Sequence, residues 1–97
     1  MTTNSPGESR KQREALTKEA LAEVVRLSIF RRRMYQTTVA RSSGVSRSFI
    51  RSILRAEKCC SLALFVELCH GLRADPCELL REVLGRRDEL RKLRGEI

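Results

Sequence analysis

The sequence has few of the residues on which catalysis and single-stranded RNA recognition usually depend. Its 97 residues include one histidine, one tyrosine, three phenylalanines and no tryptophan. Histidines, carboxylates and nucleophiles occur in no spacing typical of a catalytic site, and there is no glycine-rich phosphate loop. Readers of single-stranded RNA need aromatic side chains on which bases stack. We therefore expect that the protein is not an enzyme and has no catalytic residues. Binding of single-stranded RNA would depend on its arginines alone.

Long hydrophobic runs are also absent. The longest apolar run, residues 62–66, has five residues, whereas a membrane-spanning helix needs about 20. Residues 1–7 contain no hydrophobic signal region. We therefore expect a cytoplasmic protein without a membrane partner. A chain of this length has room for one small domain, which would gain stability from dimerisation.

The four cysteines do not form a recognisable metal-binding motif. Cys59 and Cys60 are adjacent, Cys69 lies beside the single histidine, His70, and Cys77 stands apart. No Cys-x-x-Cys pair is present, and side chains of adjacent residues diverge on a helix. We expect no metal and no cofactor, and we expect the thiols to be reduced and to behave as small apolar side chains.

Acidic residues are missing from one continuous segment, residues 24–56. The rest of the chain carries twelve basic and twelve acidic side chains, so the whole net charge of +8 comes from this segment. Clustered guanidinium groups displace counterions from phosphates, and their planar forks suit phosphate oxygens and guanine edges. The segment therefore indicates a polyanionic partner, with an ordinary solvated surface as the alternative. Its arginines are Arg26, Arg31, Arg32, Arg33, Arg41, Arg47, Arg51 and Arg55.

Apolar spacing predicts an all-α protein with five helices, because no alternating strand pattern occurs. The expected helices cover about residues 15–33, 36–43, 47–56 and 62–72, and a last one runs from 76 into the C-terminal region. Gly85 is a possible interruption of the last helix. Residues 1–14 are expected to form a flexible arm, although Ser9 and Gln12 have capping-box spacing that would allow a fraying helix to begin there. Residues 15–84 would form the main domain and residues 85–97 a helical extension.

Residues 36–50 have the pattern of two helices joined by a tight turn, the arrangement that places one helix in the major groove of DNA. Small Ala40 allows close helix packing, Gly44 makes the turn, Val45 fills the gap and Ile50 anchors the following helix. The opposite face of that helix shows a stripe of hydrogen-bond donors without acids. The stripe consists of Arg47, Ser48, Arg51 and Arg55.

On these residues, the stretch from about 21 to 80 resembles the lambda-repressor-like (Xre/Cro-type) helix-turn-helix family of bacterial and phage regulators. The matching positions are Gln36, Ala40, Gly44, Val45, Ser46, Ser48 and Ile50. The resemblance implies a five-helix DNA-binding domain, here with an extended C-terminal helix. The family's usual Glu-x-Gly after the recognition helix is Leu54-Arg55-Ala56 in this chain, and its usual Ser cap before the second helix is Tyr35.

The resemblance also implies which residues contact DNA. The recognition helix, residues 47–55, would read bases through Arg47, Ser48 and Arg51. Contacts to the phosphate backbone would come from Gln36, Thr37, Arg41, Ser46 and Arg55. The implied protein is a small homodimeric transcriptional regulator, a repressor or autoregulator, that reads an inverted-repeat operator. The alternative is an antitoxin-type or partner-docking regulator whose C-terminal helix binds another protein.

The C-terminal segment has apolar residues in alternating four- and three-residue steps, which is typical of a short coiled-coil seam. We assign dimerisation to this seam, since its last residues would otherwise have nothing to cover. In the alternative, the first turns complete the core of the monomer and the rest of the segment frays. The seam residues are Val83, Leu90, Leu93 and Ile97.

Overall fold

The computed structural model describes residues 8–95. Within this range the chain forms five α-helices and no strand, which confirms the predicted all-α class. The helices are α1 (Arg10–Arg31), α2 (Gln36–Ser43), α3 (Arg47–Leu54), α4 (Leu62–Leu72) and α5 (Pro76–Leu93).

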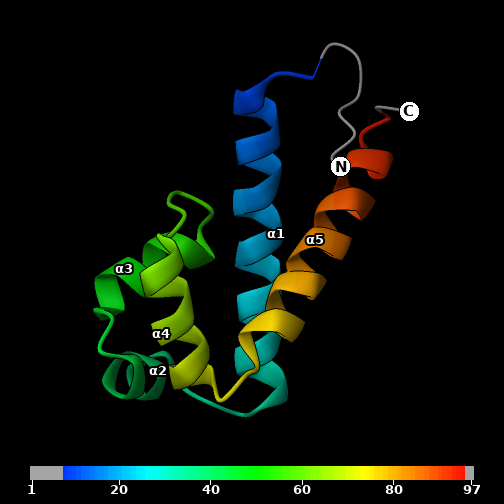
Figure 1. Ribbon diagram of the computed structural model, residues 1–97. Coiled ribbons are helices and arrows are strands. Elements are labelled where there is room, and N and C mark those ends of the chain that lie inside the picture. The colour runs from blue at the N-terminus through cyan, green and yellow to red at the C-terminus, as the bar shows by residue number, and fades with distance from the viewer. Residues whose placement is uncertain (1–7, 96–97) are drawn as a thin grey trace.

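The two long helices, α1 and α5, run antiparallel and pack along one another, while α2, α3 and α4 cluster beside α1 (Figure 1). One core joins all five helices. Its most deeply buried large side chains are Val25, Val39, Ile50, Ile53, Leu68, Cys69 and Leu72. No described helix combines the length and the apolar character needed to cross a membrane.

Helix α1 begins at Arg10, five residues before the predicted start at Ala15, so residues 10–14 are helical and do not belong to an arm. The Ser9 hydroxyl accepts a hydrogen bond from the Gln12 N–H at 3.2 Å, and the Gln12 side chain accepts one from the Ser9 N–H at 2.7 Å. The capping box therefore forms the true start of the helix. Glu8 adds a long-range anchor, since its carboxylate lies 2.9 Å from Arg91 of α5.

Helix α5 continues through Gly85 without interruption and packs back onto α1 over its C-terminal half. Two further ion pairs join the helices, between Arg86 and Glu23 at 2.7 Å and between Arg94 and Glu19 at 2.6 Å. The segment beyond residue 84 is therefore packed on the domain through α1.

This packing corrects the predicted dimerisation seam. Val83 and Leu90 keep only 3% and 6% of their surface exposed, because both lie in the core. Leu93 is 74% exposed, and Ile97 lies outside the described residues. Two of the four seam residues, Val83 and Leu90, therefore contribute to the core of the monomer and cannot contact a second copy while α5 stays on α1. The sequence could not reveal this, because the same spacing fits an intramolecular partner helix equally well.

Candidate nucleic-acid interface

Helices α2 and α3 are joined by a three-residue turn with a defined hydrogen-bond pattern. Gly44 ends α2 in the left-handed conformation (φ 76°), and its N–H donates to the Ala40 carbonyl at 2.9 Å. The buried Ser43 hydroxyl accepts from the Val45 N–H at 3.1 Å. Ser46 then caps α3, because its hydroxyl accepts from the Phe49 N–H at 3.1 Å. The turn therefore fixes the angle at which α3 leaves α2.

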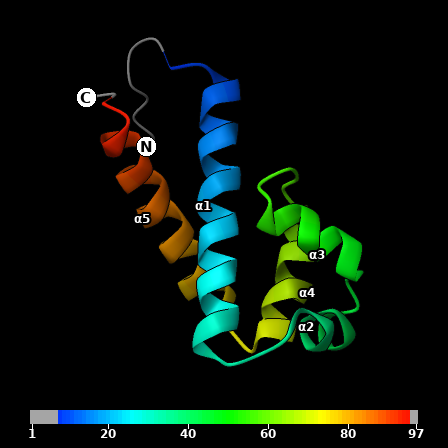
Figure 2. The same ribbon diagram turned by 180° about the vertical axis from the view of Figure 1, so that it is seen from behind.

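Helix α3 is amphipathic in the way that its sequence predicts. Ile50, Ile53 and Leu54 are buried in the core, and Val45 is buried in the turn before the helix. The predicted donor stripe lies on the opposite, solvent-exposed face, which consists of Arg47, Ser48, Arg51 and Arg55. Seen from behind, α3 lies on the outside of the molecule in front of α4 (Figure 2). The structure thus brings the four side chains together on one accessible face.

The arginines of this face have no carboxylate partner among residues 8–95. Every ion pair in that range involves Arg10, Arg86, Arg91 or Arg94, all of them on α1 or at the far end of α5. Arg47, Arg51 and Arg55 therefore keep their guanidinium groups available for a ligand. An exposed cluster of unpaired cations has a strong positive potential, which attracts anions.

The residues assigned to backbone contacts lie at the start of α2, along α2, before α3 and, for Arg55, at the end of α3. Gln36 is the first residue of α2 and is half-buried, whereas Thr37 and Arg41 are exposed one turn apart. Ser46 is exposed, and its hydroxyl proton stays available while the oxygen accepts from Phe49. Tyr35 at the N-cap of α2 makes no side-chain cap bond, so the first N–H groups of this helix lack a side-chain acceptor.

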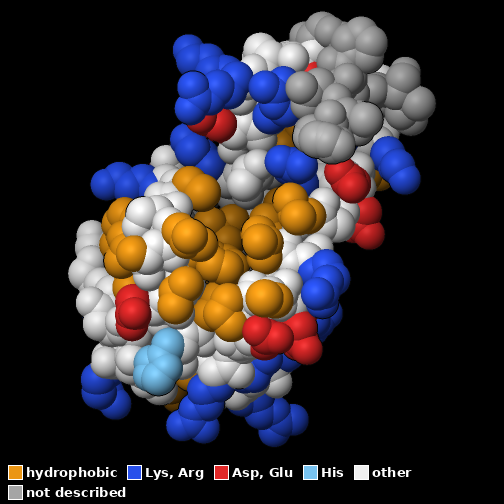
Figure 3. All heavy atoms as spheres, viewed as in Figure 1, with side chains coloured by type: hydrophobic (Ala, Val, Ile, Leu, Met, Phe, Trp, Pro, Cys, Tyr) orange, Lys and Arg blue, Asp and Glu red, His pale blue; other side chains and the backbone are white. Residues whose placement is uncertain are grey.

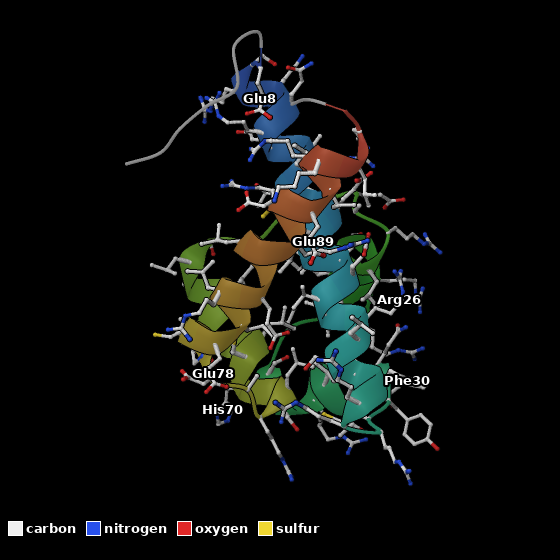
Figure 4. All side chains as sticks on the ribbon, turned by 90° about the vertical axis from the view of Figure 1, so that its right-hand side faces the viewer. Glu8, Arg26, Phe30, His70, Glu78 and Glu89 are labelled. Carbon is white, nitrogen blue, oxygen red and sulfur yellow. The ribbon has the colours of Figure 1, made fainter. Side chains whose placement is uncertain are left out.

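Two arginines of the acid-free segment have structural roles that the sequence does not reveal. The Arg26 guanidinium of α1 donates to the Leu54 carbonyl at the end of α3, and Arg32 donates to the Arg73 carbonyl at 2.9 Å. Arg26 lies on the side of the molecule opposite to His70 and Glu78 (Figure 4). Part of the positive segment therefore holds the ends of α3 and α4 in place through bonds to backbone carbonyls.

Helix α2 approaches α4 closely at Gly71, a residue that the sequence analysis did not single out. A Cβ atom at Gly71 would lie 2.7 Å from the Ser43 Cβ and 2.8 Å from the Val39 carbonyl oxygen. Only glycine allows this approach, since ordinary carbon contacts are longer. The signal in the sequence is a glycine inside a largely apolar helix, where glycine lowers helix stability and so suggests a packing reason.

Helix α3 ends at Leu54, and Ala56, two residues beyond it, adopts the left-handed conformation (φ 60°). The Ala56 N–H donates to the Ile53 carbonyl and the Glu57 N–H to the Ser52 carbonyl, both at 2.9 Å. This is the position where the resemblance leads one to expect glycine. The helix end therefore forms with an alanine, at a conformational cost that glycine would avoid.

We expect Ala56→Gly to raise the free energy of unfolding by about 1 kcal/mol. The left-handed conformation costs a non-glycine residue about 1–2 kcal/mol, and glycine removes this cost. Part of the gain is lost because glycine has more conformational freedom to lose on folding. Urea denaturation followed by circular dichroism measures the change. Gly44→Ala is the matched control: its Cβ would contact nothing within 4 Å, so the same conformational cost should appear with the opposite sign. An unchanged midpoint for both variants would contradict this account.

Only one of the four cysteines has the buried position expected of a small apolar side chain: Cys69 lies in the core, Cys60 is half-buried, and Cys59 and Cys77 are exposed. Burial raises the pKa of the Cys60 thiol to about 11, and the neighbouring Cys59 adds to the rise. Burial likewise raises the pKa of Cys69 to about 11. Both thiols stay protonated at neutral pH, and a protonated thiol is a poor nucleophile and metal ligand. In the part of the chain that the structure describes, no three His, Cys, Asp or Glu side chains come together in a way that could hold a metal ion.

The candidate interface therefore consists of an exposed arginine-rich helix, a preceding helix without a side-chain N-cap bond, and a hydrogen-bonded turn between them. A comparison of the chain with protein-family models, with curated proteins and with solved structures finds no match.

Proposed function

We propose that this chain is a lambda-repressor-like helix-turn-helix protein that binds double-stranded DNA in a sequence-specific way and regulates transcription. The observation that carries the proposal is the exposed face of α3. Three guanidinium groups project from it with no carboxylate partner among residues 8–95, while Ile50 and Ile53 hold its other face in the core. A rigid helix with such a face is suited to recognising a charged ligand of fixed shape.

The dimensions of α3 suit the major groove. Its eight residues make a rod about 12 Å long, and the groove is about 12 Å wide. Arg47 and Arg51 lie one helical turn apart and can both face the base edges. Arginine forms two parallel hydrogen bonds to guanine O6 and N7, so we expect guanine in each half-site. Ser48 follows Arg47 in the sequence, and its shorter side chain would add a contact to the DNA at closer range.

Helix α2 would contact the phosphate backbone beside the groove. Its first N–H groups point out of the helix without a side-chain cap, and a helix N-terminus attracts phosphate through these groups and through the helix dipole. Thr37 and Arg41 lie on the exposed side of the same helix, and Arg55 lies at the far end of α3. Contacts of this kind fix the register of the protein on DNA and carry no sequence information themselves.

The proposal is tested by selecting bound sites from a random duplex pool with the full chain and sequencing them. We expect guanine-containing half-sites arranged as an inverted repeat, with centres about one helical turn apart, because a two-fold dimer reads such operators. Binding that depends on salt but enriches no sequence would contradict sequence-specific recognition. Stronger binding to a matched single-stranded RNA pool would contradict the assignment to duplex DNA.

A further inference from the structure

The inward face of α1 changes character along the helix. Leu21 and Val24 on this face are buried in the core. Thr17 lies one turn before Leu21 on the same face, and Arg13 lies one turn before Thr17. These two residues line a surface pocket of about 400 Å³, which we call the α1–α5 pocket, and its other walls come from α5 and from the segment between α3 and α4. A pocket of this size can hold a small organic molecule.

The α1–α5 pocket is basic. Figure 3 shows Lys and Arg side chains gathered above the central apolar area, over the N-terminal half of α1. Four basic residues and one acid line the pocket, and the acid, Glu14, forms an ion pair with Arg10 at 3.3 Å. Three cationic side chains therefore remain, and they are Arg13, Lys18 and Arg87.

These three cations have no carboxylate partner among residues 8–95. The other acids along this part of the chain are engaged elsewhere. The carboxylates of Glu8, Glu19 and Glu23 each lie 2.6–2.9 Å from a different arginine, on α5 or directly after it. Because like charges close together repel one another, an anion in the pocket would lower the electrostatic energy of the protein.

Arg87 has a hydrogen-bond donor that is not satisfied. Its side chain is half-buried, and its Nε atom is buried with no hydrogen-bond partner in the described part of the chain. Its Nη1 atom donates to the Thr17 hydroxyl at 3.4 Å, which is longer than an ordinary hydrogen bond. Buried donors in native proteins nearly always have a partner, and a guanidinium fork suits the paired oxygens of a carboxylate or phosphate. Arg87 is therefore the residue at which an oxyanion would gain most.

We propose that the α1–α5 pocket binds a small organic anion through a carboxylate or phosphate group. The guanidinium of Arg87 binds the oxyanion, Lys18 and Arg13 add positive charge, and the methylene stems of these side chains contact the organic part of the ligand. Helix α1 lies between α3 and α5 in both ribbon views (Figures 1 and 2), so Arg87 lies across α1 from the candidate nucleic-acid interface. The proposal therefore does not rest on DNA binding.

The charge of the pocket is tested with Cys59, an exposed thiol that lines it. Cys77, an exposed thiol in the first turn of α5 outside the pocket, is the internal reference. We expect the ratio of alkylation by anionic iodoacetate to alkylation by neutral iodoacetamide to be about 3-fold or more higher at Cys59, because the cations attract the anionic reagent. Peptide mapping by mass spectrometry measures both rates. Cys60 reacts slowly, since burial raises the pKa of its thiol to about 11.

Ligand binding is measured as protection of Cys59 from iodoacetamide. Citrate and glycerol 3-phosphate are the probes for a carboxylate and a phosphate ligand, and the probe that protects at the lower concentration identifies the oxyanion. We expect saturable protection of Cys59 and no protection of Cys77. Glycerol, and sodium chloride at the same ionic strength, should protect neither thiol, because they lack an oxyanion and act only as solute and as screening salt.

Variants of the full chain assign the protection to the pocket. Arg87→Gln and Lys18→Gln should each raise the probe concentration for half-protection about 10-fold, because each removes a charged donor from the oxyanion. Arg81→Gln is the matched control, an exposed arginine on α5 outside the pocket, and should leave the protection unchanged. Thermal unfolding without a probe shows that each variant still folds.

The proposal is overturned if neither probe gives saturable protection, if Cys59 and Cys77 are protected equally, or if the protection survives both pocket variants. Protection by a duplex oligonucleotide and by neither small anion would overturn it as well and would assign the pocket to the nucleic-acid interface. None of the small-anion measurements uses an operator, so their failure leaves the proposed function intact. A chain that selects no DNA sequence but shows protection would reject the proposed function and leave the pocket.

Discussion

Arg51→Ala is expected to weaken binding to the selected operator by about 5- to 150-fold per half-site while changing binding to random duplex DNA only slightly. The range corresponds to the 1–3 kcal/mol that one good bidentate contact contributes to discrimination between bases. Arg51 is exposed in the middle of α3 and has no acidic partner in residues 8–95, so its removal costs no intramolecular ion pair. Arg47→Ala should behave in the same way. Fluorescence anisotropy with both duplexes over a range of salt concentrations measures the two affinities.

Three controls separate base reading from simple loss of charge. Arg51→Lys keeps the charge but loses the planar fork, so it should lose specificity and keep its salt dependence. Arg41→Ala on α2 should weaken binding to all duplexes alike and lower the slope against salt by about 1, because it removes a proposed phosphate contact. Arg81→Ala removes one exposed charge on α5 and should leave both affinities nearly unchanged. Equal losses of affinity for operator and random DNA in the alanine variants of Arg47, Arg51 and Arg41 would reject the roles assigned to these residues.

Gly71→Ala is expected to lower the free energy of unfolding by about 2–3 kcal/mol. The added methyl group would lie 2.7 Å from the Ser43 Cβ and 2.8 Å from the Val39 carbonyl oxygen, and the backbone of α2 would have to move to admit it. Overpacking of this kind costs about 1–3 kcal/mol or more, well above the helix propensity that alanine gains over glycine. Because α2 leads directly into the turn before α3, we also expect weaker operator binding in the folded variant. Denaturation and anisotropy on the same sample measure both effects.

Gly85→Ala provides the matched control for that variant. It is the same substitution inside another helix, but a Cβ atom at Gly85 would meet nothing within 4 Å. We therefore expect it to stabilise the protein by about 0.5–1 kcal/mol, with no effect on DNA binding, since alanine loses less backbone freedom than glycine on folding. A destabilised Gly85→Ala, or a Gly71→Ala as stable as the parent chain, would contradict the packing described for α2 and α4.

The local pattern of the sequence was sufficient to predict the helices and the residues on the exposed face of α3. Periodicity places Ile50 and Ile53 on one side and Arg47 and Arg51 on the other wherever the helix packs, because the helical period alone separates them. Caps such as Ser46 and Ser61 act within four residues, so helix starts could be predicted from neighbouring residues. The start of α1 was missed because a capping box is also compatible with a fraying helix. The contact that anchors this start joins Glu8 to Arg91, 83 residues away in the sequence.

The long-range contacts could not be predicted in this way. The apolar residues of α5 show the same spacing whether they cover α1 of the same molecule or a second copy. Only the antiparallel packing of α1 and α5 assigns Val83 and Leu90 to the core and leaves Leu80 and Leu84 outside. The role of Arg26 as a donor to the end of α3 and the contact of Gly71 with α2 depend on the same tertiary arrangement.

By itself, then, the sequence determined the helices, their amphipathic faces and the acid-free arginine segment, since each of these depends on residues close together in the chain. The tertiary structure decided which face of each helix is covered and by what, because burial depends on partners that lie far apart in the sequence. It also separated Arg26 and Arg32, which donate to backbone carbonyls, from Arg47, Arg51 and Arg55, which have no carboxylate partner among residues 8–95. The sequence could not separate them, since every arginine carries the same charge and only the distance to a carbonyl or carboxylate distinguishes them.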